Sequence, residues 1–130
     1  MEETKVGREL LKELQRAAWL PPFSINGVRD IVEMMGVMYG ESQELQRRAR
    51  AEGLDMRAPE TSCAPMTRML TMIRNRDLLM GYLRKRMEKI EEARWDVAGN
   101  LPNEALELLS PNEREYDREY AELLAEYQAE

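Results

Sequence analysis

The 130-residue chain contains no histidine, one cysteine and one phenylalanine, and only 6% of its residues are aromatic. Without histidine, general acid–base catalysis would depend on carboxylates, lysine or tyrosine, and no carboxylate lies in an apolar setting that would raise its pKa. Cys63 has neither a partner for a disulfide nor a histidine to activate it as a nucleophile. The sequence therefore argues against an enzyme, and we expect no cofactor.

Patterns that bind metals, nucleotides or membranes are missing as well. The glutamates between residues 88 and 92 have lysine neighbours, which is typical of a solvated, ion-paired helix face rather than a metal site. Gly36 and Gly40 are not followed by the lysine of a phosphate-binding loop. No apolar run approaches the about 20 residues of a membrane span, and the first residues do not resemble a secretory signal. We expect a soluble, intracellular protein without a metal site.

Leucine, methionine, alanine, glutamate and arginine dominate the composition, whereas strand-forming residues are scarce. Apolar residues recur at the helical period. The sequence therefore predicts an all-α fold, a helical bundle with one long central helix. The predicted helices cover residues 4–18, 26–52, 64–98 and 103–109, and a last helix follows Ser110.

Three of these helices have recognisable start signals. Asn26 is expected to cap the second helix. Pro65 is expected in the first turn of the third helix, where its missing N–H costs nothing. Ser110, Pro111 and Glu113 form the pattern of a capping box, in which serine and glutamate satisfy each other's backbone N–H groups.

Glycines mark the second helix and its end. Gly53 is expected to end the helix, and residues 53–64, which have no apolar period, to form a surface loop. Gly36 and Gly40 lie four residues apart inside the helix and weaken it by up to about 1 kcal/mol each relative to alanine. They indicate either the close approach of another backbone or local fraying.

The third helix is too long for one small core to cover. Its 35 residues would extend roughly 50 Å, whereas a compact domain of this size is about 35–40 Å across. It is also apolar on more than one side, which indicates burial on more than one side. We infer that partner chains complete its packing. A seam at three- and four-residue spacing comprises Met66, Met69, Ile73, Arg76, Met80, Leu83, Met87, Ile90, Arg94 and Val97.

The charges are unevenly distributed over a chain of net charge −6. Residues 68–94 carry eight basic against four acidic residues, and residues 103–130 carry nine acidic against two basic residues. Arg76 and Arg94 lie in the apolar seam and need carboxylates or carbonyls, because burying a guanidinium unpaired is costly. The acidic last helix is one source of partners, and another subunit is a second.

A different use of the basic residues is contact with DNA. In this alternative the chain is a small helical nucleic-acid-binding module, and Arg84, Lys85, Arg86 and Lys89 on helix 64–98 form a surface for phosphates. The acidic net charge, the lack of aromatic residues among these bases and the lack of a helix-turn-helix signal argue against it.

Several short motifs resemble the first Psf subunit of GINS, the heterotetramer of eukaryotic DNA replication. The motifs are Leu20-Pro21-Pro22-Phe23, Asn26-Gly27-Val28-Arg29, Tyr39, Ile73-Arg74-Asn75-Arg76, Tyr82, Arg86, Arg94-Trp95 and Leu101-Pro102. The Arg-Asn-Arg and Arg-Trp elements, with Leu-Pro after them, are the more specific part. The resemblance extends from Glu9 to about Tyr127.

The resemblance implies a helical A domain whose long helices pack against related subunits. It implies a non-catalytic, nuclear subunit that scaffolds the CMG helicase. The implied partners are the three other GINS subunits, the MCM hexamer, a RecJ-like protein and DNA polymerase epsilon. The family also carries a strand-rich B domain after the helices, and because the chain is still helical at Glu130, we expect a single A domain over residues 1–130 without it.

Eight residues of the long helix are predicted to form the subunit interface. Arginines and aromatic residues anchor it, and methionines with one leucine add apolar contact. The predicted interface residues are Arg74, Arg76, Met80, Tyr82, Leu83, Met87, Arg94 and Trp95.

Overall fold

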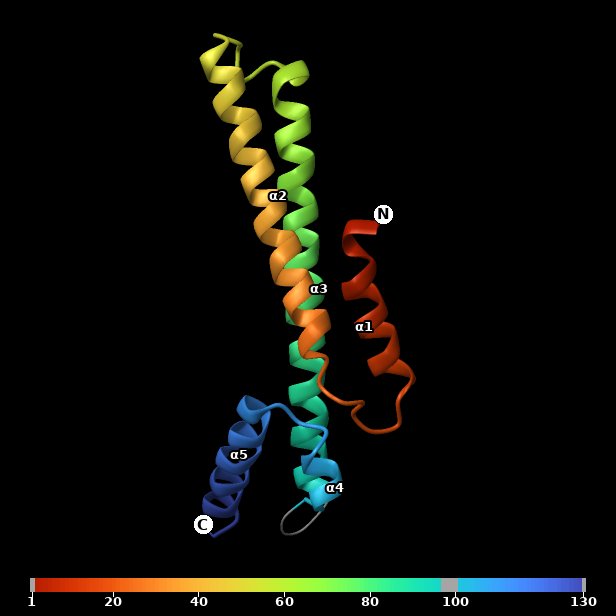
Figure 1. Cartoon of the computed structure of the whole chain (residues 1–130). Coiled ribbons are helices and arrows are strands. Elements are labelled where there is room, and N and C mark those ends of the chain that lie inside the picture. The colour runs from red at the N-terminus through yellow and green to blue at the C-terminus, as the bar shows by residue number, and fades with distance from the viewer. Residues whose placement is uncertain (1, 97–100, 130) are drawn as a thin grey trace. The chain divides into compact units, whose positions relative to one another are not determined.

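The computed structural model describes residues 2–96 and 101–129, and within these ranges the chain is helical and contains no strand. The predicted all-α fold is confirmed. Figure 1 shows the elements in chain order. They are the 3₁₀ helix η1 (Glu2–Thr4) and the α-helices α1 (Lys5–Arg16), α2 (Ile25–Ala51), α3 (Pro59–Asp96), α4 (Asn103–Leu106) and α5 (Pro111–Ala129).

The starts of α2 and α3 differ from the predictions, and α1 and α4 end two or three residues earlier than predicted, at Arg16 and Leu106. α2 begins at Ile25, so Asn26 is its second residue and not its cap. α3 begins at Pro59, which itself takes the favoured first position, so Pro65 lies inside the helix and the predicted loop is shorter. Val97 and the predicted end of this helix near residue 98 lie outside the described residues.

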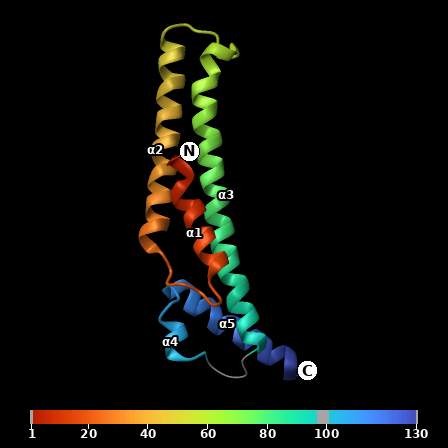
Figure 2. The ribbon, with the colours of Figure 1, turned by 90° about the vertical axis from the view of Figure 1, so that its right-hand side faces the viewer.

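The chain divides into two compact units, which we describe separately. Unit 1 comprises Met1–Leu10 and Ile25–Met80, and unit 2 comprises Leu11–Ser24 and Gly81–Glu130. In unit 1, α2 and the first part of α3 run antiparallel around the connection after Ala51 (Figure 2). Ser42 Oγ on α2 donates a hydrogen bond to the Pro65 carbonyl on α3 at 3.2 Å.

Two glycines in unit 1 have structural roles. Gly53 has a φ of +71°, and the Leu54 N–H bonds the Ala49 carbonyl at 2.9 Å, which is the geometry of a Schellman ending and confirms that the helix ends at this glycine. Gly7 lies against α3, and a Cβ there would stand 2.9 Å from Leu78 Cβ. Glycine at position 7 therefore allows the backbone of α1 to approach α3.

Unit 2 packs the segment before α2 and the last two helices onto the end of α3. Its buried apolar residues are Leu14, Leu20, Tyr82, Ile90, Leu101 and Leu109. The predicted capping box is present, because Ser110 Oγ accepts from the Glu113 N–H at 3.2 Å and Glu113 Oε1 accepts from the Ser110 N–H at 3.0 Å. Among the described helices, none is both long and apolar enough to cross a membrane.

Candidate functional site: buried cations and exposed apolar surfaces

Arg86 is the fully buried centre of unit 2, with 0% of its surface exposed. Its Nε donates to Glu113 Oε2 at 2.8 Å, and its Nη2 donates to Glu113 Oε1 at 3.1 Å. Its Nη1 reaches the Pro21 carbonyl at 2.7 Å, and its Nη2 also reaches the Leu108 carbonyl at 3.0 Å. One guanidinium thus joins α3 to the 21–24 segment, to the chain after α4 and to α5.

Two aromatic rings enclose the same guanidinium. The Arg86 carbon Cζ lies 5.3 Å from the centroid of Phe23 and 5.7 Å from that of Tyr82. The Tyr82 hydroxyl accepts the Ser24 N–H at 3.2 Å. Cation–π attraction adds to the ion pair where water is excluded. Arg86 therefore acts as a structural element of unit 2.

Arg94 forms a second buried ion pair. Its Nε and Nη2 donate to Asp117 Oδ1 and Oδ2, each at 2.7 Å, in the bidentate geometry that suits guanidinium and carboxylate. Asp117 lies on α5 and is itself buried. The prediction that the acidic last helix supplies a partner for Arg94 is confirmed.

Lys89 is bound by backbone carbonyls at the end of α1. Its Nζ donates to the carbonyls of Leu14 and Ala17, each at 3.0 Å, and lies 3.5 Å from that of Trp19. The last carbonyls of a helix have no partners within the helix and carry partial negative charge. The ammonium of Lys89 therefore caps α1 from α3.

These contacts correct the interpretation of residues 84–89 as a basic surface for nucleic acid. Arg86 is buried and Lys89 is bound by carbonyls. Only Arg84 and Lys85 of the four are exposed, and Lys85 pairs with Glu88 at 3.2 Å. The arrangement therefore offers phosphates little free positive charge.

The predicted interface residues fall into three groups. Tyr82 and Arg94 are buried inside unit 2, with 2% and 9% of their surface exposed. Leu83 is half-buried. The exposed members are Arg74, Arg76, Met80, Met87 and Trp95.

Arg76 does not occupy the buried seam position that the sequence suggested. Its side chain is 58% exposed, and it pairs with the adjacent Asp77 at 3.1 Å. Its neighbour Asn75 is the residue of this motif that is buried, with 1% exposed, and both polar atoms of its side chain lack a hydrogen-bond partner in the described part of the chain. Asn75 belongs to the Arg-Asn-Arg motif, and no residue pattern predicted its burial.

Unit 1 leaves apolar side chains in solvent along two helices. On α3 they are Met66, Leu70 and Met80, and on α2 they include Ile25, Val32, Val37 and Tyr39. Gly36 and Gly40 lie within the second group, and a Cβ on either would meet no atom within 4 Å. The helix continues through both glycines, which rules out local fraying there. No backbone of the described chain approaches them.

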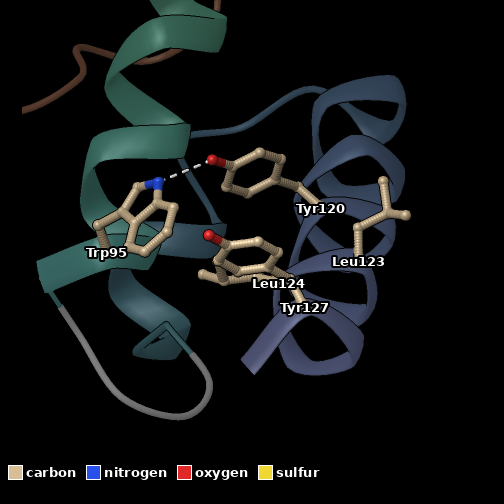
Figure 3. A pocket seen from close by; sticks show the side chains of 5 residues that line it. All are labelled: Trp95, Tyr120, Leu123, Leu124 and Tyr127. Carbon is tan, nitrogen blue, oxygen red and sulfur yellow. Dashed lines mark hydrogen bonds between the residues drawn. The ribbon is translucent and has the colours of Figure 1, made fainter. Parts of the chain in front are cut away.

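Unit 2 carries an apolar hollow between the end of α3 and α5 (Figure 3). Trp95 Nε1 donates to the Tyr120 hydroxyl at 2.8 Å, and the Tyr116 hydroxyl donates to Glu91. Burial, and secondly the bond to the Glu91 carboxylate, raise the pKa of Tyr116 to about 12. The hydrogen bond between Trp95 and Tyr120 holds two of the rings that line the hollow. Its lining residues are Trp95, Tyr120, Leu123, Leu124 and Tyr127.

Comparison with known proteins places the chain in a family. Residues 40–130 match the GINS complex protein helical bundle domain (Sld5). The chain therefore belongs to the GINS helical bundle family. It is similar to the DNA replication complex GINS protein PSF1 of Xenopus laevis, with 32% identity over 121 residues, and to PSF1 of Mus musculus and Homo sapiens, each with 31% identity over 121 residues. Each match covers 92% of this chain and 60% of the relative. The resemblance to the first Psf subunit is thereby confirmed.

Proposed function

We propose that this chain is a non-catalytic subunit of a GINS heterotetramer that scaffolds the CMG helicase during initiation and elongation of DNA replication. Membership of the GINS helical bundle family and the similarity to PSF1 proteins support this assignment. The chain contains no histidine, and the buried cations of unit 2 stabilise its packing, which is what a structural subunit requires.

The observation that carries the proposal is the exposure of large apolar side chains on α3 in both units. Leu70 and Met80 in unit 1, and Trp95 in unit 2, are each more than half exposed. Exposed apolar side chains that cluster on one element mark sites of protein association. Partner subunits would cover them, and the buried ion pairs would keep α3 straight and packed while they do so.

The interface is proposed to use the exposed members of the predicted set, Arg74, Arg76, Met80, Met87 and Trp95, with Leu83 at its edge. Tyr82 and Arg94 contribute indirectly, because their contacts hold unit 2 together. The open face of α2 around Gly36 and Gly40 is a second contact, since two glycines allow the backbone of a partner helix to approach closely.

The wider partners follow from GINS membership and belong to the proposal. They are the three other GINS subunits, the MCM hexamer, the RecJ-like protein of the replicative helicase and DNA polymerase epsilon. The same assignment implies a nuclear location. No metal or cofactor is part of the proposed role.

Co-expression with the three other GINS subunits of the same organism tests the proposal. With the affinity tag on another subunit, this chain should co-purify in one monodisperse complex. Leu70→Glu and Met80→Glu should reduce the recovered chain about tenfold or more, because a carboxylate in an apolar contact must be desolvated without a partner.

Leu54→Glu is the matched control, because Leu54 is 48% exposed but lies in the turn between α2 and α3. It should co-purify like the unmodified chain. Unchanged assembly of the Leu70 and Met80 variants, with circular dichroism showing intact helices, would reject the interface. Failure of the unmodified chain to join the complex would reject the proposed function itself.

A further inference from the structure

Unit 2 has an exposed apolar surface that includes the predicted interface residue Trp95 but lies mainly on α5. We define the Trp95 patch as Trp95, Tyr120, Leu123, Leu124 and Tyr127, which line a hollow of about 300 Å³ (Figure 3). Trp95, Leu123 and Tyr127 are each more than half exposed. Pockets that hold small molecules bury most of the ligand's surface. The walls of this hollow are too open to bury most of a small molecule. The hollow therefore suits a side chain of another protein better than a free small molecule.

The floor of the Trp95 patch is already ordered. The indole N–H of Trp95 is used by the Tyr120 hydroxyl at 2.8 Å, and the rings of Tyr116 and Tyr120 stack with centroids 6.1 Å apart. Aromatic side chains with few rotatable bonds lose little entropy when they bind, and those already held in place lose less. A partner therefore needs to supply apolar contact at the centre and no hydrogen bond to the indole.

The rim of the Trp95 patch is acidic. Glu119 precedes Tyr120 on α5, Glu126 precedes Tyr127, and all residues from 119 to 127 lack positive charge. Consecutive residues of a helix lie about 100° apart around its axis, so both glutamates border the patch. On α3, Glu92 and Asp96 are exposed beside Trp95, and the Arg94 guanidinium between them is bound to Asp117.

We propose that the Trp95 patch binds an amphipathic helix of a partner protein whose apolar face is flanked by lysine or arginine. The apolar residues would fill the hollow between α3 and α5 in the manner of a helix in a groove. The flanking cations would face the acidic rim. A second copy of this chain fits poorly, because two acidic rims would meet, and nucleic acid is repelled by the same charges. Trp95 also belongs to the proposed subunit interface, so this helix and a partner subunit would compete for that residue, whereas the peptide test itself needs no GINS subunit.

The test uses a synthetic helix of about 18 residues, with leucine on one face and lysine beside it, labelled for fluorescence anisotropy. A second peptide replaces each lysine with glutamate. The full chain should bind the lysine peptide, and binding should weaken as salt rises. Leu123→Ser/Tyr127→Ser should weaken it about tenfold or more, since these side chains would form the centre of the contact.

Two control variants carry the same chemical changes elsewhere in the chain. Leu54→Ser/Met66→Ser removes a comparable pair of exposed apolar side chains from unit 1 and should bind normally. The charge variant Glu119→Lys/Glu126→Lys should lose affinity for the lysine peptide and gain it for the glutamate peptide. Its control, Glu9→Lys/Glu52→Lys, makes the same change at exposed positions of unit 1.

Several results would overturn the proposal. The first is equal affinity of the chain for the lysine and glutamate peptides. The second is a loss of affinity in the unit 1 control as large as that in Leu123→Ser/Tyr127→Ser. The third is no binding of the lysine peptide by the unmodified chain. Sedimentation that shows a dimer abolished by Leu123→Ser/Tyr127→Ser would assign the patch to a second copy instead. Subunit co-purification is a separate measurement, so the GINS proposal can fail while this one stands.

Discussion

Replacement of Arg86 by methionine should sharply destabilise unit 2. The change leaves Glu113 buried without its cation, and breaking a buried pair from one side costs about 3–5 kcal/mol. The Leu108 carbonyl keeps a donor, because it also accepts the Phe23 N–H at 3.0 Å, whereas the Pro21 carbonyl loses the Arg86 bond. That orphaned acceptor adds about 1 kcal/mol or more. We therefore expect a loss of about 4–6 kcal/mol.

Urea unfolding followed by tryptophan fluorescence measures this loss in the correct unit. Both tryptophans, Trp19 and Trp95, belong to unit 2, whereas circular dichroism reports helix throughout the chain. Small domains are stable by only about 5–15 kcal/mol, so the fluorescence midpoint should fall to low urea or vanish. The matched control is Arg84→Met, two residues away and exposed, which should change stability by less than about 0.5 kcal/mol.

A second variant separates the lost cation from a general packing defect. Glu113→Gln in the Arg86→Met background removes the stranded charge, and glutamine still serves in a capping box with Ser110. The double variant should recover about 1–3 kcal/mol relative to Arg86→Met alone, as coupled neighbours do in such cycles. If Arg86→Met costs no more than Arg84→Met, or if Glu113→Gln restores nothing, the described network does not hold unit 2 together.

Three further predictions concern other parts of the chain. Asn75→Leu should raise the free energy of unfolding by about 1–3 kcal/mol in urea titrations, because it removes a buried amide without partners. A lower free energy of unfolding would show that the amide does have hydrogen-bond partners. Gly36→Ala/Gly40→Ala should raise helical stability by up to about 1 kcal/mol per site in thermal melts. The same variant should impair co-purification with the GINS subunits. Normal assembly would refute the close approach of a partner backbone. The pKa of Tyr116 is about 12 in the folded chain against a usual 10.0, so its neutral form stabilises unit 2 fully below pH 10 and this contribution disappears as pH rises towards 12. Tyr116→Phe should remove that alkaline loss, which absorbance and fluorescence titrations follow, and an unchanged profile would exclude Tyr116 as its cause.

The sequence predicted the features that depend on neighbouring residues. Helix content and the capping box of Ser110 and Glu113 follow from local period and local hydrogen bonding, and both are confirmed. The acidic last helix also indicated a partner for Arg94. These signals require no knowledge of how distant segments pack.

The role of Arg86 could not be predicted in the same way. Two of its acceptors are the backbone carbonyls of Pro21 and Leu108. Every residue has a carbonyl, so the residue types do not indicate which carbonyls accept these bonds. The carbonyls that bind Lys89 are likewise remote in sequence. One signal was present: Arg86 lies four residues from both Tyr82 and Ile90, which places it on the same buried side of α3.

The predicted seam along the long helix is not buried over its whole length, and the reason is geometric. A strict seven-residue repeat drifts by about 20° per heptad on a straight α-helix with 3.6 residues per turn. Ile73 of this repeat is half-buried, and the other members become less exposed along the helix, from 62% at Met66 through 53% at Met80 and 39% at Met87 to 9% at Arg94. One line of residues thus begins at the surface and ends in a core. Arg76 is exposed although it shares the seam with Leu83, which is half-buried, and Ile90, which is fully buried.

The pairing of the cations inside unit 2 reduces the positive charge that this chain can offer to DNA. Arg86, Lys89 and Arg94 have their charges engaged inside unit 2, so the charge that remains at the surface is more acidic than the basic run of α3 suggests. Phosphate binding depends on cations that release counterions, and these three are not free to do so. The exposed residues of α3 also include five large apolar side chains, which favours contact with protein: Met66, Leu70, Met80, Met87 and Trp95. Under the proposed function, we therefore expect partner subunits rather than this chain to make most of the contact with DNA.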